Sequence, residues 1–97
     1  MTKADLLVLL KADLNMLYVD DKRTRQLRHL IDAAEQMIGR EGIKFSCPYS
    51  AEDGSLIIMY AAYLYRKRIT DEGMPRMLRW AMNNRLFSQK AGEEDAT

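Results

Sequence analysis

The chain has 97 residues, of which 47% are hydrophobic, and this suits one domain with a modest core. The hydrophobic share excludes general disorder, and a formal net charge of +1 gives no argument from the whole molecule for or against a nucleic-acid partner. The single cysteine, Cys47, excludes an internal disulfide and fits a reducing compartment.

The first seventeen residues predict a helix. Thr2 is suited to cap it, with Asp5 in its first turn. Leucines then recur at helical spacing, at Leu6, Leu7, Leu10 and Leu14. We expect this helix to end at about residues 14–17. No basic head precedes a long apolar run, so we predict no signal peptide and a location where the chain is made.

The second helix has the clearest periodicity in the chain. Asp20 or Asp21 is suited to cap it, and Gly39 or Gly42 to end it. Its apolar positions follow the i, i+3, i+4, i+7 rule, at Leu27, Leu30, Ile31, Ala34, Met37 and Ile38. Residues 42–50 then predict a loop whose aromatic side chains lie against the core, because Pro48 makes a sheet strand unfavourable.

A third helix over about residues 51–69 is predicted to be the centre of the fold. Ser50 is suited to cap it, and its residues 56–65 are all apolar or aromatic. Such a helix must be covered on every side, yet it is too short to cross a membrane. We therefore expect part of this surface to meet another subunit, and the candidate interface is Met59, Tyr60, Tyr63, Met77 and Trp80.

Pro75 is suited to the first position of a fourth helix. The apolar face expected for it consists of Met77, Leu78, Ala81, Met82 and Leu86, with Trp80 and Phe87 beside it. The polar, acidic end predicts a helical domain over residues 1–90 and a flexible tail over 91–97. The predicted fold is all-α: a small single-domain bundle of about four helices with a long apolar central helix.

No catalytic set is visible in the sequence. His29 is the only histidine and lies off the apolar face of its helix, so a surface role is favoured, and Cys47 lacks an evident base. Asp20 and Asp21 lack the alternating acids of a calcium loop, and the glycines do not form a phosphate-binding loop. We predict no enzyme activity, metal or cofactor.

Basic residues are concentrated late in the chain. Residues 66–90 hold seven bases against Asp71 and Glu72, whereas residues 91–97 contain only acids among their charged residues. One interpretation is charge complementation at a helix end. The other is a basic patch for phosphates or an acidic partner, formed by Arg66, Lys67, Arg68, Arg76 and Arg79.

Four elements of the chain resemble the phage head–tail connector, or head-completion, proteins. The helix that ends Tyr-Ala-Ala-Tyr-Leu-Tyr-Arg-Lys-Arg is similar to the family's apolar helix, with Tyr65 and Arg68 at its Tyr-x-x-Arg positions. Gly73-Met74-Pro75 is similar to the turn before the family's last helix, although Arg85 here precedes Leu86. The opening leucine-rich helix and the helix over residues 28–38 also resemble their counterparts.

The resemblance implies a structural function without catalysis. Such adaptors form a ring, commonly of twelve subunits, beneath the portal of a capsid, and they extend the DNA channel. The implied partners are other copies of the chain, the portal, and a tail or stopper protein, with non-specific contact to packaged DNA and no membrane. The implied location is the host cytoplasm during assembly of a phage or prophage particle and then the virion. On this interpretation residues 75–97 dock on the portal and residues 39–50 face the tail.

The alternative is a small DNA-binding or regulatory protein in which residues 51–69 and 75–88 form a helix-turn-helix. The would-be recognition helix is rich in Met, Trp and Leu and poor in side chains that reach base edges, which weakens this interpretation.

Overall fold

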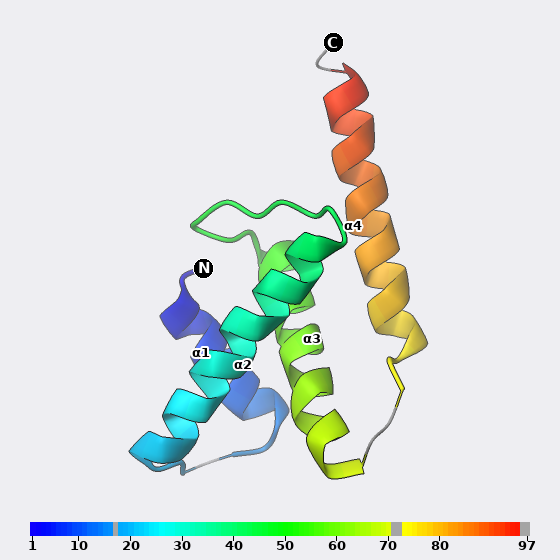
Figure 1. The fold of residues 1–97 in the computed structure, drawn as a ribbon. Helices are drawn as coiled ribbons and strands as arrows, with labels where there is room; N and C mark the ends of the chain where they lie inside the picture. Colours follow the sequence, from blue (N-terminus) through cyan, green and yellow to red (C-terminus); the bar gives the residue numbers. More distant parts are fainter. Residues whose placement is uncertain (17, 71–72, 96–97) are drawn as a thin grey trace.

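Four helices, joined by short connections, make up the computed structural model, which describes residues 1–16, 18–70 and 73–95, without the side chains of 93–95 (Figure 1). They are α1 (Lys3–Asp13), α2 (Asp21–Arg40), α3 (Ala51–Thr70) and α4 (Arg76–Asp95). No strand occurs in the described part of the chain. The predicted all-α fold with four helices is confirmed.

The two expected N-caps of α1 and α2 are present. Thr2 and Asp5 form a capping box: the Thr2 amide donates to Asp5 Oδ2 at 2.9 Å, and the Asp5 amide donates to Thr2 Oγ1. Asp20, rather than Asp21, caps α2, because its carboxylate accepts from the Arg23 amide at 2.7 Å. The helix α1 ends at Asp13, slightly earlier than expected.

Helix α2 contributes the regular apolar face that its periodicity predicts. Its buried residues are Leu27, Leu30, Ile31, Ala34 and Ile38. Met37 is the exception among the predicted face residues and is 38% exposed. Beyond Arg40 the chain turns at Gly42, whose φ of 97° lies in the left-handed region that favours glycine, whereas Gly39 lies within the helix.

The loop between α2 and α3 covers one end of the core, as predicted. Ile43 and Tyr49 are buried, and Phe45 is partly buried with its ring edge-on to Tyr49. The Tyr49 hydroxyl donates to Glu35 of α2 at 2.9 Å, and its amide donates to the Met1 carbonyl at 2.8 Å. The loop therefore joins the start of the chain to the start of α3.

Helix α3 is the central element, since α1, α2 and α4 all pack against it. The buried side chains within residues 56–65 are Leu56, Ile57, Ile58, Tyr60, Ala61 and Ala62. The other four are partly buried, and none is exposed. Three neighbouring helices of the same chain thus cover most of this stretch, and only its four partly buried residues leave surface for the predicted contact with another subunit.

Helix α4 runs antiparallel to α3, and its C-terminal end extends beyond the other helices (Figure 1). It begins at Arg76, one residue after the predicted first position at Pro75. It continues to Asp95, so the helix does not stop at the predicted boundary between domain and tail at residue 91. Residues 96–97 of the predicted tail lie outside the described residues.

Candidate assembly surface

The inner face of α4 holds the helix to the rest of the domain. Leu78 and Met82 are each 1% exposed. Farther along, Arg85 Nε donates to Asp53 Oδ1 at 2.7 Å, in the first turn of α3, and Arg85 Nη2 donates to the Lys44 carbonyl at 2.8 Å. Gln89 bonds both the Gly42 carbonyl and the Lys44 amide, each at 2.8 Å. The attachment is therefore apolar near the start of α4 and polar near its middle.

The outer face of α4 is largely apolar, and no described residue of this chain covers it. Met77 is 75% exposed, Trp80 74% and Phe87 76%. Successive residues of an α-helix are about 100° apart, so these three share one side with Asn84 and Ala91, which are also exposed. We call these five residues the α4 stripe. On an ordinary surface, exposed apolar side chains are scattered singly, whereas here three large ones lie within about 15 Å along one helix.

Two hollows flank the partly buried Met59 on α3. One lies toward α1, has a volume of about 470 Å³, and is lined by Leu9, Ala12, Asp13, Ser55, Ile58 and Met59. The other lies toward α4, has a volume of about 280 Å³, and is lined by Glu52, Ser55, Leu56, Met59, Ala81, Asn84 and Arg85. The chain thus presents a depression with apolar side chains in its lining as well as the α4 stripe.

The structure divides the five residues predicted to form the subunit interface. Tyr60 is 4% exposed and offers almost no surface to a second subunit, so it belongs to the core. Met59 and Tyr63 are partly buried, and the Tyr63 ring lies edge-on to that of Tyr60 with centroids 5.8 Å apart. Met77 and Trp80 are exposed on the α4 stripe.

Two residues of α4 needed a different assignment. Met77 was expected both on one apolar face with Leu78 and Met82 and in the subunit interface; it is exposed, whereas Leu78 and Met82 define the buried inner face. Phe87 was placed only beside the apolar face. Its separation from Trp80 by seven residues, about two turns, is the sequence signal that joins it to the stripe.

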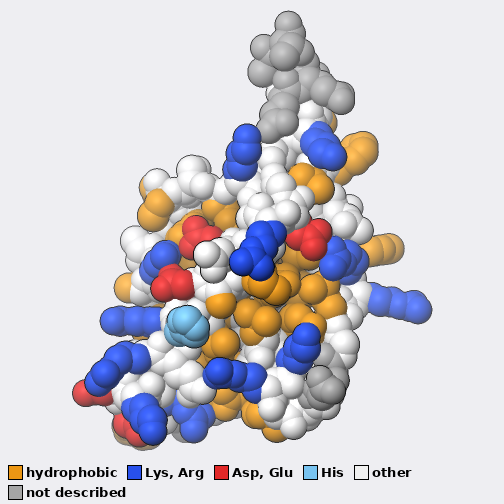
Figure 2. Space-filling model, in the orientation of Figure 1, with side chains coloured by type: hydrophobic (Ala, Val, Ile, Leu, Met, Phe, Trp, Pro, Cys, Tyr) orange, Lys and Arg blue, Asp and Glu red, His pale blue; other side chains and the backbone are white. Residues whose placement is uncertain are grey.

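The five predicted basic-patch residues make different contacts. Arg66 lies 3.6 Å from Asp13 of α1, while Arg79 forms a 3.1 Å ion pair with Glu41 after α2. The Lys67 ammonium lies 5.9 Å from the centroid of the Tyr63 ring. Arg68 and Arg76 are exposed. In Figure 2, Lys and Arg side chains are spread around an apolar area rather than gathered in one place.

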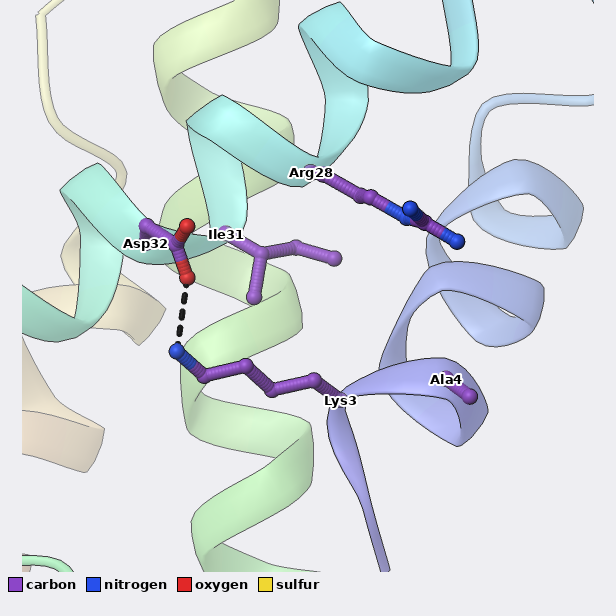
Figure 3. Close-up of a pocket in the computed structure, with 5 residues that line it drawn as sticks. All are labelled: Lys3, Ala4, Arg28, Ile31 and Asp32. Carbon is purple, nitrogen blue, oxygen red and sulfur yellow. Dashed lines mark hydrogen bonds and ion pairs between the residues drawn. The ribbon is translucent and has the colours of Figure 1, made fainter. Parts of the chain in front are cut away.

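A further hollow lies between α1 and α2 and has a volume of about 310 Å³ (Figure 3). Lys3 Nζ donates to Asp32 Oδ1 at 2.8 Å, and Arg28 extends toward α1 on the other side of Ile31. The hydrogen bond with Asp32 raises the pKa of Lys3, so the ammonium stays charged at neutral pH and cannot serve as a base. This arrangement is a surface ion pair over an apolar floor.

The described residues contain no group of three His, Cys, Asp or Glu side chains placed to hold a metal ion. His29 and Cys47 are both exposed, on α2 and on the following loop. Among the described helices, none combines the length and apolar character that crossing a membrane requires.

The fold and surfaces define an all-α domain of four helices with a covered core and an uncovered apolar face on its last helix. Comparisons with protein families, curated proteins and solved structures give no match to this chain.

Proposed function

We propose that the chain is a structural adaptor of a phage or prophage particle, which assembles into a ring beneath the portal and joins head to tail. The observation that carries the proposal is the α4 stripe. The core is covered by the chain's own helices, yet Met77, Trp80 and Phe87 are three-quarters exposed. Surface of this kind is typical of protein–protein contact sites.

A ring requires two unlike surfaces on each subunit, because each copy contacts the next in a head-to-tail manner. The α4 stripe projects from one helix, and the hollows beside Met59 lie between α1, α3 and α4. A projecting apolar surface and a depression with apolar lining on the same chain support lateral assembly. This assignment moves the proposed subunit contact from the middle of α3 to α4.

The partners follow from the resemblance to head–tail connectors. The end of α4 extends beyond the other helices, where it is accessible to a portal (Figure 1). The loop between α2 and α3 lies toward the same end of the domain, which does not fit the expectation that residues 39–50 face the tail. The exposed Arg68 and Arg76 suit non-specific contact with the phosphates of packaged DNA. No catalytic step is part of the proposal.

The helix-turn-helix alternative would make α4 the recognition helix. Its outward face carries Met77, Trp80 and Phe87, which provide few hydrogen-bonding groups for the edges of bases. A gel shift across a salt series separates the two functions: the adaptor predicts at most weak, sequence-independent binding, whereas the alternative predicts a preferred sequence that persists at higher salt.

The direct test is to mix the purified chain with the portal protein encoded in the same genome and to image the particles by electron microscopy. We expect a second ring stacked on the portal. The W80A/F87A variant should not form it, whereas Y18A, which removes an aromatic side chain that is 98% exposed elsewhere, should behave as the wild type. A portal that remains bare with the wild-type chain would contradict the proposal.

A further inference from the structure

The α4 stripe has a spacing that makes it complementary to itself. Its residues lie at positions 77, 80, 84, 87 and 91, nearly symmetric about Asn84. Two such helices placed antiparallel, with Asn84 opposite Asn84, bring the same surface of each chain into contact. We propose that two free copies of the chain pair in this way, about a two-fold axis that passes near Asn84.

Size complementarity favours this register. With Asn84 opposite itself, Met77 of one copy lies opposite Ala91 of the other, and Trp80 lies opposite Ser88. Phe87 lies opposite Ala81, which is only partly buried in its own chain. Each large side chain of the stripe therefore meets a small one, the arrangement by which antiparallel helices interdigitate.

Charge favours antiparallel over parallel pairing. The sequence of α4 begins with Arg76, which is exposed, and closes with Glu93, Glu94 and Asp95. Positions 76 and 94 are eighteen residues apart, about five full turns, so they fall on the same flank of the helix. Antiparallel pairing sets the basic start of one helix beside the acidic end of the other, and it also opposes the helix dipoles.

The rest of the domain does not obstruct the pair. The inner face of α4, with Leu78 and Met82 buried, lies opposite the stripe around the helix. Two copies joined through the stripe therefore hold their other helices on the outer sides. The end of α4 also extends beyond those helices, which leaves the last part of the stripe accessible (Figure 1).

The pair closes on itself, because a two-fold contact uses the same surface on both copies and leaves none for a third. If the proposed ring uses the α4 stripe, the pair is a resting form that must open before assembly. That role rests on the proposed function, but the pair itself does not. It is tested on the isolated chain, whereas the ring is tested on the portal.

The contact is small, since a standard interface buries about 800 Å² per partner and one helix face supplies less. We therefore expect a dissociation constant in the micromolar range or weaker. Sedimentation over a concentration series should show a monomer–dimer equilibrium. Trp80 is the only tryptophan, so its fluorescence should shift to the red as the pair dissociates on dilution.

Single cysteines test the register directly. In a C47S background, N84C should be joined to itself efficiently by a short bismaleimide, because the two-fold axis brings the two copies of position 84 together. M77C is the matched control on the same stripe: two copies of position 77 lie about 21 Å apart in the pair and should not be joined. Mixing M77C with A91C should restore the product.

Stripe variants test the energetics. W80A/F87A should raise the dissociation constant at least about tenfold, since large aromatic side chains dominate such contacts. Y18A should leave it unchanged. R76E should weaken pairing more than R40E, which makes the same charge change at the exposed end of α2, and R76E/E94R should recover it.

Three results would overturn the proposal. A chain that stays monomeric at millimolar concentration lacks the pair. Equal cross-linking of M77C and N84C indicates parallel helices or non-specific contact, and cross-linking of neither, in a chain that does associate, places the contact elsewhere.

Discussion

The ion pair between Arg85 and Asp53 should be the most important polar contact for stability between α4 and the rest of the domain. The Nε–Oδ1 distance is 2.7 Å, and the two side chains are only 19% and 13% exposed. Arg85 also donates to the Lys44 carbonyl, and its guanidinium lies 5.8 Å from the centroid of the Phe45 ring. One side chain thus joins α4 to the start of α3 and to the loop before it.

Removing this arginine leaves a largely buried carboxylate without its cation. Breaking a fully buried pair costs about 3–5 kcal/mol, whereas an exposed pair contributes about 0–1 kcal/mol. Because the remaining exposure lowers the penalty and the lost backbone bond raises it, we expect R85A to reduce the free energy of unfolding by about 2–4 kcal/mol. That is a large share of the about 5–15 kcal/mol typical of a domain.

The chain offers a matched control on the same helix. Arg79 pairs with Glu41 at 3.1 Å, but these side chains are 45% and 41% exposed. R79A should therefore cost less than about 1 kcal/mol. Urea unfolding followed by circular dichroism measures both variants, at protein concentrations low enough to keep every chain monomeric.

A double-mutant cycle then isolates the pair. In an R85A background, D53N should lower the free energy of unfolding only slightly further. The coupling energy between the two positions should therefore exceed about 1.5 kcal/mol. If R85A and R79A destabilise the chain equally, or if the cycle shows no coupling, burial does not set the strength of this contact and the reasoning fails.

Three further substitutions test the packing by the same unfolding assay, and a pH titration tests the environment of Tyr49. G54A should be less favourable than G39A by about 1–3 kcal/mol, because its added methyl group meets Met1 Sδ and comes within 3.2 Å of Leu6 Cδ2, whereas the one in G39A has open space. Equal effects would contradict this close approach. L78A should cost about 2–5 kcal/mol, and a cost below about 1 kcal/mol would mean that α4 is not anchored there. Burial, reinforced by the hydrogen bond to the Glu35 carboxylate, raises the pKa of Tyr49 to about 12 from 10.0. The neutral Tyr49 hydroxyl therefore contributes fully to stability below pH 10, and this contribution is lost between pH 10 and 12. An ultraviolet titration in which every tyrosine ionises near 10 would refute this.

Sequence reasoning predicted the helices well because their signals are local. Thr2, Asp20 and Ser50 all accept bonds from backbone amides at helix starts, as their residue types suggested. The apolar spacing of α2 likewise identified its buried face, with Met37 as the exception. Both signals depend only on neighbours within a few residues in the chain.

The placement of α4 was harder because it depends on the other helices. Met77 and Leu78 are adjacent and both apolar, and nothing between positions 77 and 87 marks which of two overlapping apolar faces turns inward. In the structure, Arg85 bonds Asp53 from the same side of the helix as the buried Leu78 and Met82. A contact between residues 32 positions apart leaves no local trace in the sequence.

Enclosure of α3 changes what the apolar content of the chain means. An apolar helix has to be buried, and here α1, α2 and the inner face of α4 bury most of the apolar surface of α3. The surplus lies instead on the outer face of α4, where Met77, Trp80 and Phe87 do not contribute to the buried core. Substitutions in α3 should therefore act on folding, and substitutions on the α4 stripe on association. A stripe variant that leaves unfolding unchanged but abolishes pairing and ring formation would link both to this face.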